Sequence, residues 1–388
     1  MRVRKLLRKT RKSKRIRRGF THTGKRTYWK LTFLYAALLA FTIVLLPALL
    51  ANMILRGTDD EKSHRDVERE PPDLSLELSN EIFVLNVYDA RQRKQVEMNL
   101  NEYLVGVVAA EMPARFHEEA LKAQAVAART YALHHARQLG GRGCSTHPEA
   151  DVCTDSTCCQ AWVGEADMNA KWPPETAKDF HDRIVRAVLD TQGAVVISGE
   201  ALAQALYHST CGGMTEAAGN VWDGSNPDYL QSVSCSYCNH SQHYQNELTM
   251  KLAEYVAALK NESGLLPVLS SENAPHMEIV RRSPSGRNLL VRLGNPGRLF
   301  HGTEVRNLLG LPSTHFQWRV DDNQIVFETR GFGHGVGLCQ YGADGMAREG
   351  AGFEDILAFY YRDTTISHWS TLYPEMRKLH YYTNTIPQ

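Results

Sequence analysis

The sequence lacks the biased composition of fibrous or disordered proteins, and two of its segments lack charges: residues 1–30 have no acidic residue, and residues 31–55 have no charged residue. An apolar fraction of 43% and a charged fraction of 22% exclude collagen, coiled coils and a chain that is disordered throughout. Residues 1–30 hold 14 of the 44 Lys and Arg residues but no Asp or Glu. The rest of the chain therefore sets 30 basic residues against 43 acidic ones, a net charge of −13. An acidic body of this kind argues against nucleic acid as a partner.

Residues 31–55 contain no charged residue, which indicates a transmembrane helix. A helix of this length is about 37 Å long, and the hydrocarbon core of a bilayer is about 30 Å thick. The basic flank, residues 1–30, predicts a cytoplasmic tail and an extracytoplasmic body, so we expect a single-pass protein of the cell membrane. A cleaved signal peptide is the alternative, with residues 48–51 as the cleavage site, but its apolar core usually spans only about 7–15 residues.

The remaining sequence predicts a flexible tether at residues 56–80 and one α+β body at residues 81–388. Strands and helices follow one another without the regular alternation of parallel sheets, which favours the α+β class. The expected strands are residues 82–89, 96–100, 183–198 (in its last part), 202–208, 277–282, 289–293 and 324–329. The expected helices are residues 101–112, with Asn101 as N-cap, 116–139, 250–259, 338–348 and 353–361.

Glu111 ends an apolar run in the segment Val107-Val-Ala-Ala-Glu-Met-Pro113. Burial of a lone carboxyl in such a run raises its pKa, so that it stays protonated near neutral pH and can act as a general acid. A structural ion pair, or a helix end that faces solvent, is the alternative interpretation. Arg129 on the following helix is the expected partner in either case.

An irregular segment after residue 140 combines one imidazole with three thiols within 13 residues. Such a mixture suits tetrahedral zinc, and a closed site would hold a segment that has little other means of ordering itself. Disulfides are the alternative, since an extracytoplasmic location permits them. The residue types alone favour neither. The four side chains are His147, Cys153, Cys158 and Cys159.

Four glycines alternate through residues 331–337 in the sequence Gly-Phe-Gly-His-Gly-Val-Gly. This spacing is not the G-x-G-x-x-G of dinucleotide-binding proteins. Alternate glycines free one face of the chain from side chains, so that a ligand or another backbone can approach closely. A packed turn is one interpretation. In the other, the segment lines a cleft beside Glu111, and His334 positions the substrate or orients Glu111 through a hydrogen bond.

Two further polar clusters are weaker signals. Residues 208–216, His-Ser-Thr-Cys-Gly-Gly-Met-Thr-Glu, fit the lining of a cleft but also fit a simple turn. Cys235-Ser-Tyr-Cys238 is followed by His240 and His243, and this spacing favours a disulfide or surface histidines over a metal site. No local role is evident for Cys144, Cys211 and Cys339.

Five motifs between about residues 81 and 367 resemble, in order, the stage II sporulation protein D family of endospore-forming bacteria. They are L-x-E-Y-L-x-G-V-V-A-x-E-M-P, A-L-K-A-Q-A-V-A-A-R-T-Y-A, D-V-C-x-D with C-Q-A-W, H-S-T-x-G-G-x-T-E and G-F-G-H-G-V-G-L-x-Q-Y-G-A-x-x-M-A. The resemblance implies a membrane-anchored lytic transglycosylase of the sporulation septum. Its implied partners are peptidoglycan glycan strands without stem peptides, the cytoplasmic membrane and other sporulation wall hydrolases such as stage II sporulation protein P.

The resemblance also implies roles for single residues. Glu111 corresponds to the catalytic acid, and Arg129 belongs to the functionally important set. Zinc-binding members carry His-x5-Cys-x4-His-Cys, which implies a structural zinc ion bound here by His147, Cys153, Cys158 and Cys159, with one histidine replaced by cysteine. Gln231 stands where other members carry a lysine. The implied substrate-binding residues are His208, Ser209, Thr210, Tyr229, Gly333, His334, Gly335 and Gln340.

The implied reaction needs only one carboxyl group. Glu111 protonates the leaving oxygen and then, as a carboxylate, removes the proton of the C6 hydroxyl, which closes a 1,6-anhydro ring without a second carboxylate. Two alternatives stay open. One is a non-catalytic wall-binding or scaffold protein; the other is a zinc-dependent wall amidase, which would need an open metal position where cysteine-rich sites are usually closed.

Overall fold

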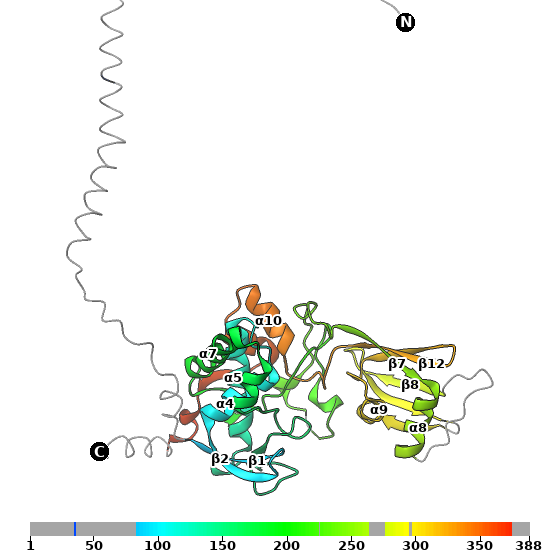
Figure 1. Cartoon of the computed structure of the whole chain (residues 1–388), viewed down its shortest axis with the longest axis horizontal. Helices are drawn as coiled ribbons and strands as arrows, with labels where there is room; N and C mark the ends of the chain where they lie inside the picture. Colours follow the sequence, from blue (N-terminus) through cyan, green and yellow to red (C-terminus); the bar gives the residue numbers. More distant parts are fainter. Residues whose placement is uncertain (1–34, 36–82, 225, 264–275, 295–296, 375–388) are drawn as a thin grey trace, which may run out of the picture. The chain divides into compact units, whose positions relative to one another are not determined.

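The computed structural model describes Tyr35 and residues 83–224, 226–263, 276–294 and 297–374. From residue 83 on, these residues belong to one structural unit, Pro72–Gln388, whose mixed helices and strands confirm the α+β class (Figure 1). The basic tail, the tether and, apart from Tyr35, the predicted span at 31–55 lie outside the described residues. Within the described ranges, no helix is both long and apolar enough to cross a membrane.

The larger of two hydrophobic cores is built by residues 83–238 together with residues 336–369. Its helices are α4 (Leu100–Glu111), α5 (Glu118–His135), α6 (Glu165–Lys171), α7 (Pro174–Asp190), α10 (Gln340–Arg348) and α11 (Phe353–Tyr360). Its strands are β1 (Val84–Asp89), β2 (Lys94–Asn99), β3 (Val152–Cys153), β4 (Ala194–Ser198), β5 (Ala201–Leu202), β6 (Tyr207–His208), β13 (Leu338–Cys339) and β14 (Thr365–His368).

The strands of this core form three small sheets, with the orders β2-β1-β3, β14-β4-β5 and β13-β6. β1 and β2 pair antiparallel as the predicted hairpin. β3 adds parallel to β1, and β13 adds parallel to β6. These two parallel pairings matter for function, because they bring the cysteine-rich loop and the glycine-rich segment onto strands that are distant in sequence.

Helix α5 lies at the centre of the larger core and contacts α4, α7, α10, α11 and β4. In Figure 1, α4, α5 and α7 lie together. Ala125, Ala128 and Ala132 are fully buried, and their small side chains let the neighbouring elements approach the helix closely. The central position of α5 joins the end of α4, which carries Glu111, to the start of α10, which carries Gln340.

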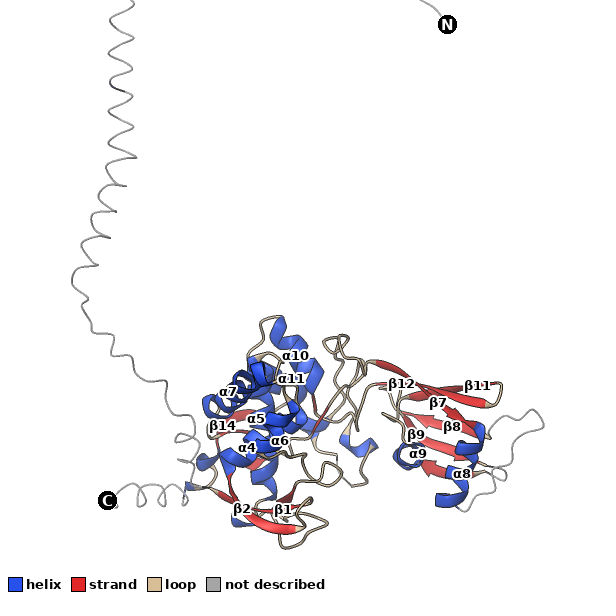
Figure 2. Cartoon of the chain, in the orientation of Figure 1, coloured by secondary structure: helices blue, strands red, loops and turns tan. Residues whose placement is uncertain are grey.

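The smaller core lies within residues 252–327 and is rich in strands (Figure 2). Its two sheets have the orders β11-β12-β7 and β10-β9-β8. Its strands are β7 (Gln245–Lys251), β8 (Met277–Arg282), β9 (Asn288–Leu293), β10 (Arg298–His301), β11 (Phe316–Asp321) and β12 (Gln324–Arg330). Its helices are α8 (Leu252–Ser263) and α9 (Gly302–Leu309).

Most predicted elements are present, with local corrections. The N-cap of α4 is Asn99 rather than Asn101, since the Asn99 side chain accepts the Asn101 N–H at 2.9 Å. Residues 183–190 are helical and belong to α7, whose buried residues recur at helical rather than alternating spacing. Of residues 202–208, only the first pairs with β4, whereas residues 207–208 form β6 and pair with β13.

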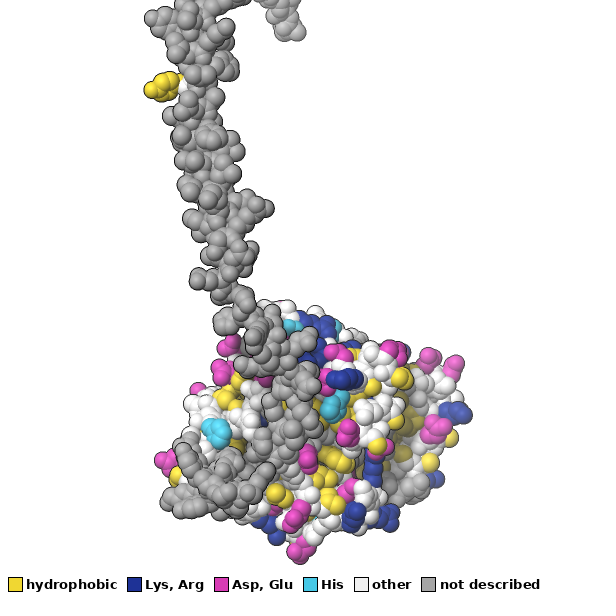
Figure 3. Space-filling model, turned by 60° about the vertical axis from the view of Figure 1, so that its left-hand side comes forward, with side chains coloured by type: hydrophobic (Ala, Val, Ile, Leu, Met, Phe, Trp, Pro, Cys, Tyr) yellow, Lys and Arg dark blue, Asp and Glu magenta, His cyan; other side chains and the backbone are white. Residues whose placement is uncertain are grey.

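The described surface carries both signs of charge. On the face drawn in Figure 3, acidic and basic side chains are interspersed. Exposed ion pairs such as Arg319–Glu328 and Lys178–Asp182 contribute little stability, because water and salt screen them. This is the pattern of a solvated protein surface.

Candidate active site

A cleft of about 1110 Å³ is lined by the end of α4, the loop after β3, strand β6 and the glycine-rich segment. Among the described residues that line it, Glu111 is the only carboxylate. Arg115, Lys171 and Arg306 give the lining a positive charge. Aromatic side chains supply much of its apolar surface: Trp172, Phe180, Tyr207, Trp222, Phe332 and Tyr341.

Glu111 reaches the cleft because α4 stops there. Met112, the C-cap, has an extended backbone (φ −119°, ψ 144°), which is the conformation that a following proline favours. The Glu111 Oε1 accepts the Ala161 N–H at 2.9 Å, and its Oε2 accepts a hydrogen bond from Gln340 Nε2 at 3.4 Å. Burial raises the pKa of Glu111, and these two hydrogen bonds with the charge of Lys171 offset part of that rise.

The groups that hold the carboxyl are themselves held in place. Gln340 is buried, and its Nε2 also lies 3.3 Å from Gln124 Oε1 on α5. Gln160, which precedes Ala161, donates to the Tyr207 hydroxyl at 2.7 Å and accepts from the Tyr103 hydroxyl at 3.1 Å. The carboxyl therefore lies in a preorganised setting. Gln124 and Gln160 carry no chemistry of their own, so no pattern in the sequence marks them as site residues.

The glycine-rich segment is both packed and exposed to the cleft. All four glycines have positive φ, between 72° and 102°. A side chain at Gly337 would meet the Leu206 carbonyl oxygen at 2.0 Å, because the segment runs directly against residues 206–211. On its other side, Phe332, Gly333 and His334 line the cleft with Glu111. The two interpretations of this segment therefore describe its two faces.

His334 contributes a neutral imidazole to the wall of the cleft. Burial, together with the charge of Arg306, lowers its pKa to about 4. Its Nδ1 accepts the Val336 N–H at 3.1 Å, and its ring lies 5.2 Å from that of Trp222 and 5.7 Å from that of His208. The hydrogen bonds that orient the Glu111 carboxyl come from Ala161 and Gln340 instead, so His334 suits contact with substrate.

Arg129 was expected to partner Glu111, but it lies outside the described lining of the cleft. Its side chain is fully buried, and its guanidinium donates to the carbonyl oxygens of Val188 at 2.9 Å and Ala194 at 3.2 Å. The described residues that line the cleft do not include it. Arg129 thus joins α5 to the end of α7 and the start of β4, a supporting role in the fold that also explains why an arginine is needed there.

Other predicted substrate-binding residues divide in the same way. His208, Ser209, Gly333, His334 and Gln340 line the cleft. Thr210, Tyr229 and Gly335 are outside the described lining. Thr210 is buried against Ser241, the Tyr229 hydroxyl accepts the Gln204 N–H at 2.8 Å, and a side chain at Gly335 would meet the Arg287 guanidinium at 2.5 Å.

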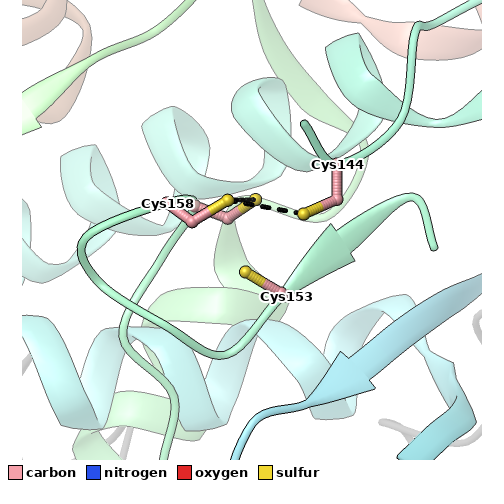
Figure 4. Close-up of side chains that lie close together, drawn as sticks. Cys144, Cys153 and Cys158 are labelled. Atoms are coloured by element: carbon pink, nitrogen blue, oxygen red, sulfur yellow. Dashed lines mark hydrogen bonds between the residues drawn. The ribbon is translucent and has the colours of Figure 1, made fainter. Parts of the chain in front are cut away.

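The cysteine-rich loop forms a four-sulfur group, here named the loop cluster, whose sulfur atoms lie within 4.8 Å of one another. Figure 4 shows the side chains of Cys144, Cys153 and Cys158 turned toward one another. The Cys144 Sγ lies 3.4 Å from the Cys158 Sγ. His147, a predicted ligand, instead stacks on Tyr88 with ring centroids 3.6 Å apart. The loop cluster consists of Cys144, Cys153, Cys158 and Cys159.

Backbone pairing explains the exchange of His147 for Cys144. The Cys144 N–H donates to the Ala150 carbonyl at 2.9 Å, which closes a turn and returns the chain beside Cys153 on β3. His147 lies within that turn and projects toward β1 instead. A spacing of eight residues between Cys144 and Cys153 matches no common metal-binding motif, so no pattern in the sequence pointed to Cys144 as a member of this group.

The loop cluster suits zinc. Ligands about 2.3 Å from a tetrahedral ion lie about 3.8 Å apart, close to the separations found here. The hydrogen bond between the Cys153 and Cys159 thiols lowers the pKa of Cys153 and raises the pKa of Cys159. All eight cysteines are described, and each is a free thiol. The loop then leads from Cys159 directly to Ala161, the donor to Glu111.

Comparison with known proteins agrees with the motifs. The profile of the family described as Stage II sporulation protein matches residues 88–197. Stage II sporulation protein D of Bacillus subtilis (strain 168) is 34% identical over 281 residues, which cover 72% of this chain and 78% of that protein. The amidase enhancer of Bacillus subtilis is 27% identical over 315 residues, which cover 69% of this chain and 40% of that protein. Because its identity to the first of these relatives extends over most of both chains, this chain belongs to the stage II sporulation protein D family of sporulation proteins.

Proposed function

We propose that this protein is a lytic transglycosylase that cleaves peptidoglycan glycan strands. The observation that carries the proposal is the isolation of Glu111. It is the single carboxylate among the described residues of a large cleft, and burial raises its pKa. Ordinary glycosidases place two carboxyl groups about 5–9.5 Å apart, one on each side of the scissile bond. One carboxyl suffices only where the substrate supplies its own nucleophile.

In the proposed reaction the protonated Glu111 carboxyl donates its proton to the glycosidic oxygen between N-acetylmuramic acid and N-acetylglucosamine. The C1–O bond breaks as the muramic ring becomes oxocarbenium-like. The Glu111 carboxylate, held by the Ala161 N–H and Gln340, then takes the proton of the C6 hydroxyl, whose oxygen bonds to C1. The acid is restored, and the product carries a 1,6-anhydro ring.

The lining of the cleft suits a sugar polymer. Aromatic rings such as Trp172 and Trp222 offer flat apolar faces, and His208, Ser209 and the glycine-rich backbone offer hydrogen-bonding groups. The cations Arg115, Lys171 and Arg306 suit the lactyl carboxylates of muramic acid without its stem peptide. This arrangement supports a peptide-stripped strand as the substrate.

The loop cluster would hold its zinc ion in a closed site of four thiolates, where the metal supplies folding energy and no open position for substrate. We propose that this ion is structural and that it fixes the loop whose Ala161 N–H donates to Glu111. The predicted span at residues 31–55 and its basic flank support a body that is tethered outside the cytoplasm, where such strands occur.

The relative named amidase enhancer favours one second candidate, a non-catalytic protein that raises the activity of a separate wall amidase. Digestion of peptide-stripped glycan strands by the full-length chain distinguishes the two. A transglycosylase yields shorter strands with 1,6-anhydro ends. A non-catalytic enhancer yields no shorter strands, but it increases the release of stem peptides when an amidase and intact peptidoglycan are present.

The pH dependence of cleavage should follow the protonated form of Glu111. Because burial raises the pKa of this group, kcat/KM is expected to stay high above the ordinary range of a glutamate and then to fall about tenfold for each pH unit beyond the raised pKa. Initial rates between about pH 4 and pH 9 test this, with melting temperatures at each pH as the control for folding. A loss of activity centred on the ordinary glutamate range would contradict the assignment.

His334→Ala should lower kcat/KM about tenfold or more, as expected for the loss of one contact that positions substrate. The melting temperature should change little, because the side chain lies in the cleft wall. A matched control is His276→Ala, at an exposed histidine outside that lining. Wild-type kcat and KM in a folded His334→Ala protein would remove this residue from the substrate site.

A further inference from the structure

A second group of four cysteines lies inside the larger core. Its sulfur atoms also lie within 4.8 Å of one another, and all four side chains are fully buried. Cys159 of the loop cluster borders the cleft, but none of these four belongs to the described lining. This core cluster consists of Cys211, Cys235, Cys238 and Cys339.

Backbone pairing brings these cysteines together from three segments. β13 pairs with β6, so that Cys339 lies opposite His208, and the Cys211 N–H donates to Cys339 Sγ at 3.2 Å. The Cys235 N–H donates to the Gly213 carbonyl at 2.9 Å, which draws the Cys235–Cys238 loop onto the same place. The sequence does not predict this grouping, because its outermost members, Cys211 and Cys339, stand more than 120 residues apart.

The geometry of the core cluster suits one central ion better than two disulfides. In each disulfide the two sulfurs lie about 2.05 Å apart, and two separate disulfides need not lie close to each other. Here every sulfur lies near every other, with Cys211 Sγ and Cys238 Sγ 3.3 Å apart, which is the arrangement that tetrahedral coordination requires. The spacing of Cys235, Cys238, His240 and His243 argued against a metal site, but neither histidine belongs to the core cluster, and the C-x2-C spacing of the two cysteines by itself is common in structural zinc sites.

The surroundings suit a negatively charged metal site. Cys339 Sγ accepts two backbone hydrogen bonds, from the N–H groups of Cys211 at 3.2 Å and Gly342 at 3.3 Å. The Cys235 Sγ lies 3.1 Å from the Tyr360 hydroxyl. Such hydrogen bonds stabilise thiolates and orient them as metal ligands.

Arg287 adds a positive charge in the same place. Its side chain is 1% exposed, and it donates to the Cys211 carbonyl at 2.8 Å. The Glu216 carboxylate and the sulfurs of the core cluster lie close enough to interact electrostatically with its guanidinium. Four thiolates around a divalent ion leave a net charge of −2, so a buried guanidinium beside them is compensated.

We propose that the core cluster is a second, structural zinc site, with the thiolates of Cys211, Cys235, Cys238 and Cys339 as its ligands. Four soft sulfur ligands in tetrahedral arrangement select zinc over the hard cations magnesium and calcium. The ion would join the segment after β6, the Cys235–Cys238 loop and the start of α10, where Gln340 contacts Glu111. The site is independent of the loop cluster and of the proposed activity.

Elemental analysis of the full-length chain, purified without chelator or added metal, tests the proposal. The wild type should contain about two zinc ions per chain. Cys238→Ser and Cys153→Ser should each lose about one, from the core cluster and the loop cluster respectively, and the double variant should contain almost none. Wild-type zinc content in folded Cys238→Ser, or iron in place of zinc, would overturn the proposal.

A second measurement on the wild type keeps the test valid if Cys238→Ser does not fold. The chain is denatured with a chelator but without reductant, alkylated and digested, and the four cysteines are identified by mass spectrometry. A zinc site predicts that all four carry the alkyl group, since metal-bound thiolates are released as free thiols. A disulfide-linked peptide that contains any of the four would overturn the proposal.

Discussion

Glu111→Gln should abolish glycan cleavage, with a fall in kcat/KM of at least about 10²–10⁴-fold. The amide has nearly the shape of the carboxyl and can keep a contact to Ala161 or Gln340, but it can neither donate a proton to the leaving oxygen nor accept one from the C6 hydroxyl. The described cleft offers no second carboxylate to replace it. The measurement is the rate of strand shortening with peptide-stripped glycan.

Stability provides the control for this variant. Because burial raises the pKa of Glu111, the stability linked to its proton is present below the unfolded pKa and is lost as pH rises through the folded pKa. Glutamine has no charge to bury, so the variant avoids the destabilisation that an ionised Glu111 causes at neutral pH. We therefore expect the melting temperature of Glu111→Gln to equal or exceed that of the wild type. Activity within tenfold of wild type in this stable variant would contradict the catalytic role.

Cys153→Ser should remove the metal of the loop cluster and with it most of the activity. Loss of a ligand should lower the melting temperature by about 5 °C or more, since each kcal/mol shifts the midpoint of a body this large by about 2–4 °C. The turnover should fall at least about tenfold, because the loop from Cys159 to Ala161 would no longer hold the N–H that Glu111 accepts. Zinc content, melting temperature and turnover are measured together.

Two further variants distinguish the ligand set that we propose from the loop cluster, with Cys144, from the set expected from sequence, with His147. Cys144→Ser should behave like Cys153→Ser, because Cys144 belongs to the loop cluster. His147→Ala should keep its zinc, because His147 stacks on Tyr88 instead. The opposite pattern, with metal lost from His147→Ala and kept in Cys144→Ser, would restore the set expected from sequence. Zinc retained by both Cys153→Ser and Cys144→Ser would remove the metal site altogether.

Local patterns predicted the local structure of this chain well. The alternation in β1 and the apolar run of α4 sufficed to place the hairpin and the helix that ends at Glu111. For Glu111 the same run left two interpretations open, and the partial burial that raises its pKa in the structure favours the general acid over the solvent-facing helix end. These features depend on neighbours within a few residues, which one sequence displays directly.

Features that depend on distant contacts could not be predicted in this way. Arg129 is fully buried on α5, and only the packing of α7 and β4 shows that its guanidinium serves their backbone carbonyls. Cys144 reaches its cluster through a turn closed by its backbone hydrogen bond to Ala150, and Cys339 reaches its cluster through the pairing of β13 with β6; neither contact has a signature in the sequence. Of the smaller core, within residues 252–327, the sequence predicted only separate strands and one short helix, without their assembly into one core.

The central claim, that Glu111 acts with a nucleophile from the substrate itself, is tested most directly by the source of the oxygen in the product. Peptide-stripped glycan strands are digested by the full-length chain in water enriched in heavy oxygen, and the new ends are weighed by mass spectrometry. Our account predicts 1,6-anhydro ends that are lighter than hydrolysed ends by one water molecule and contain no heavy oxygen. Hydrolysed ends that carry heavy oxygen from the solvent would contradict it.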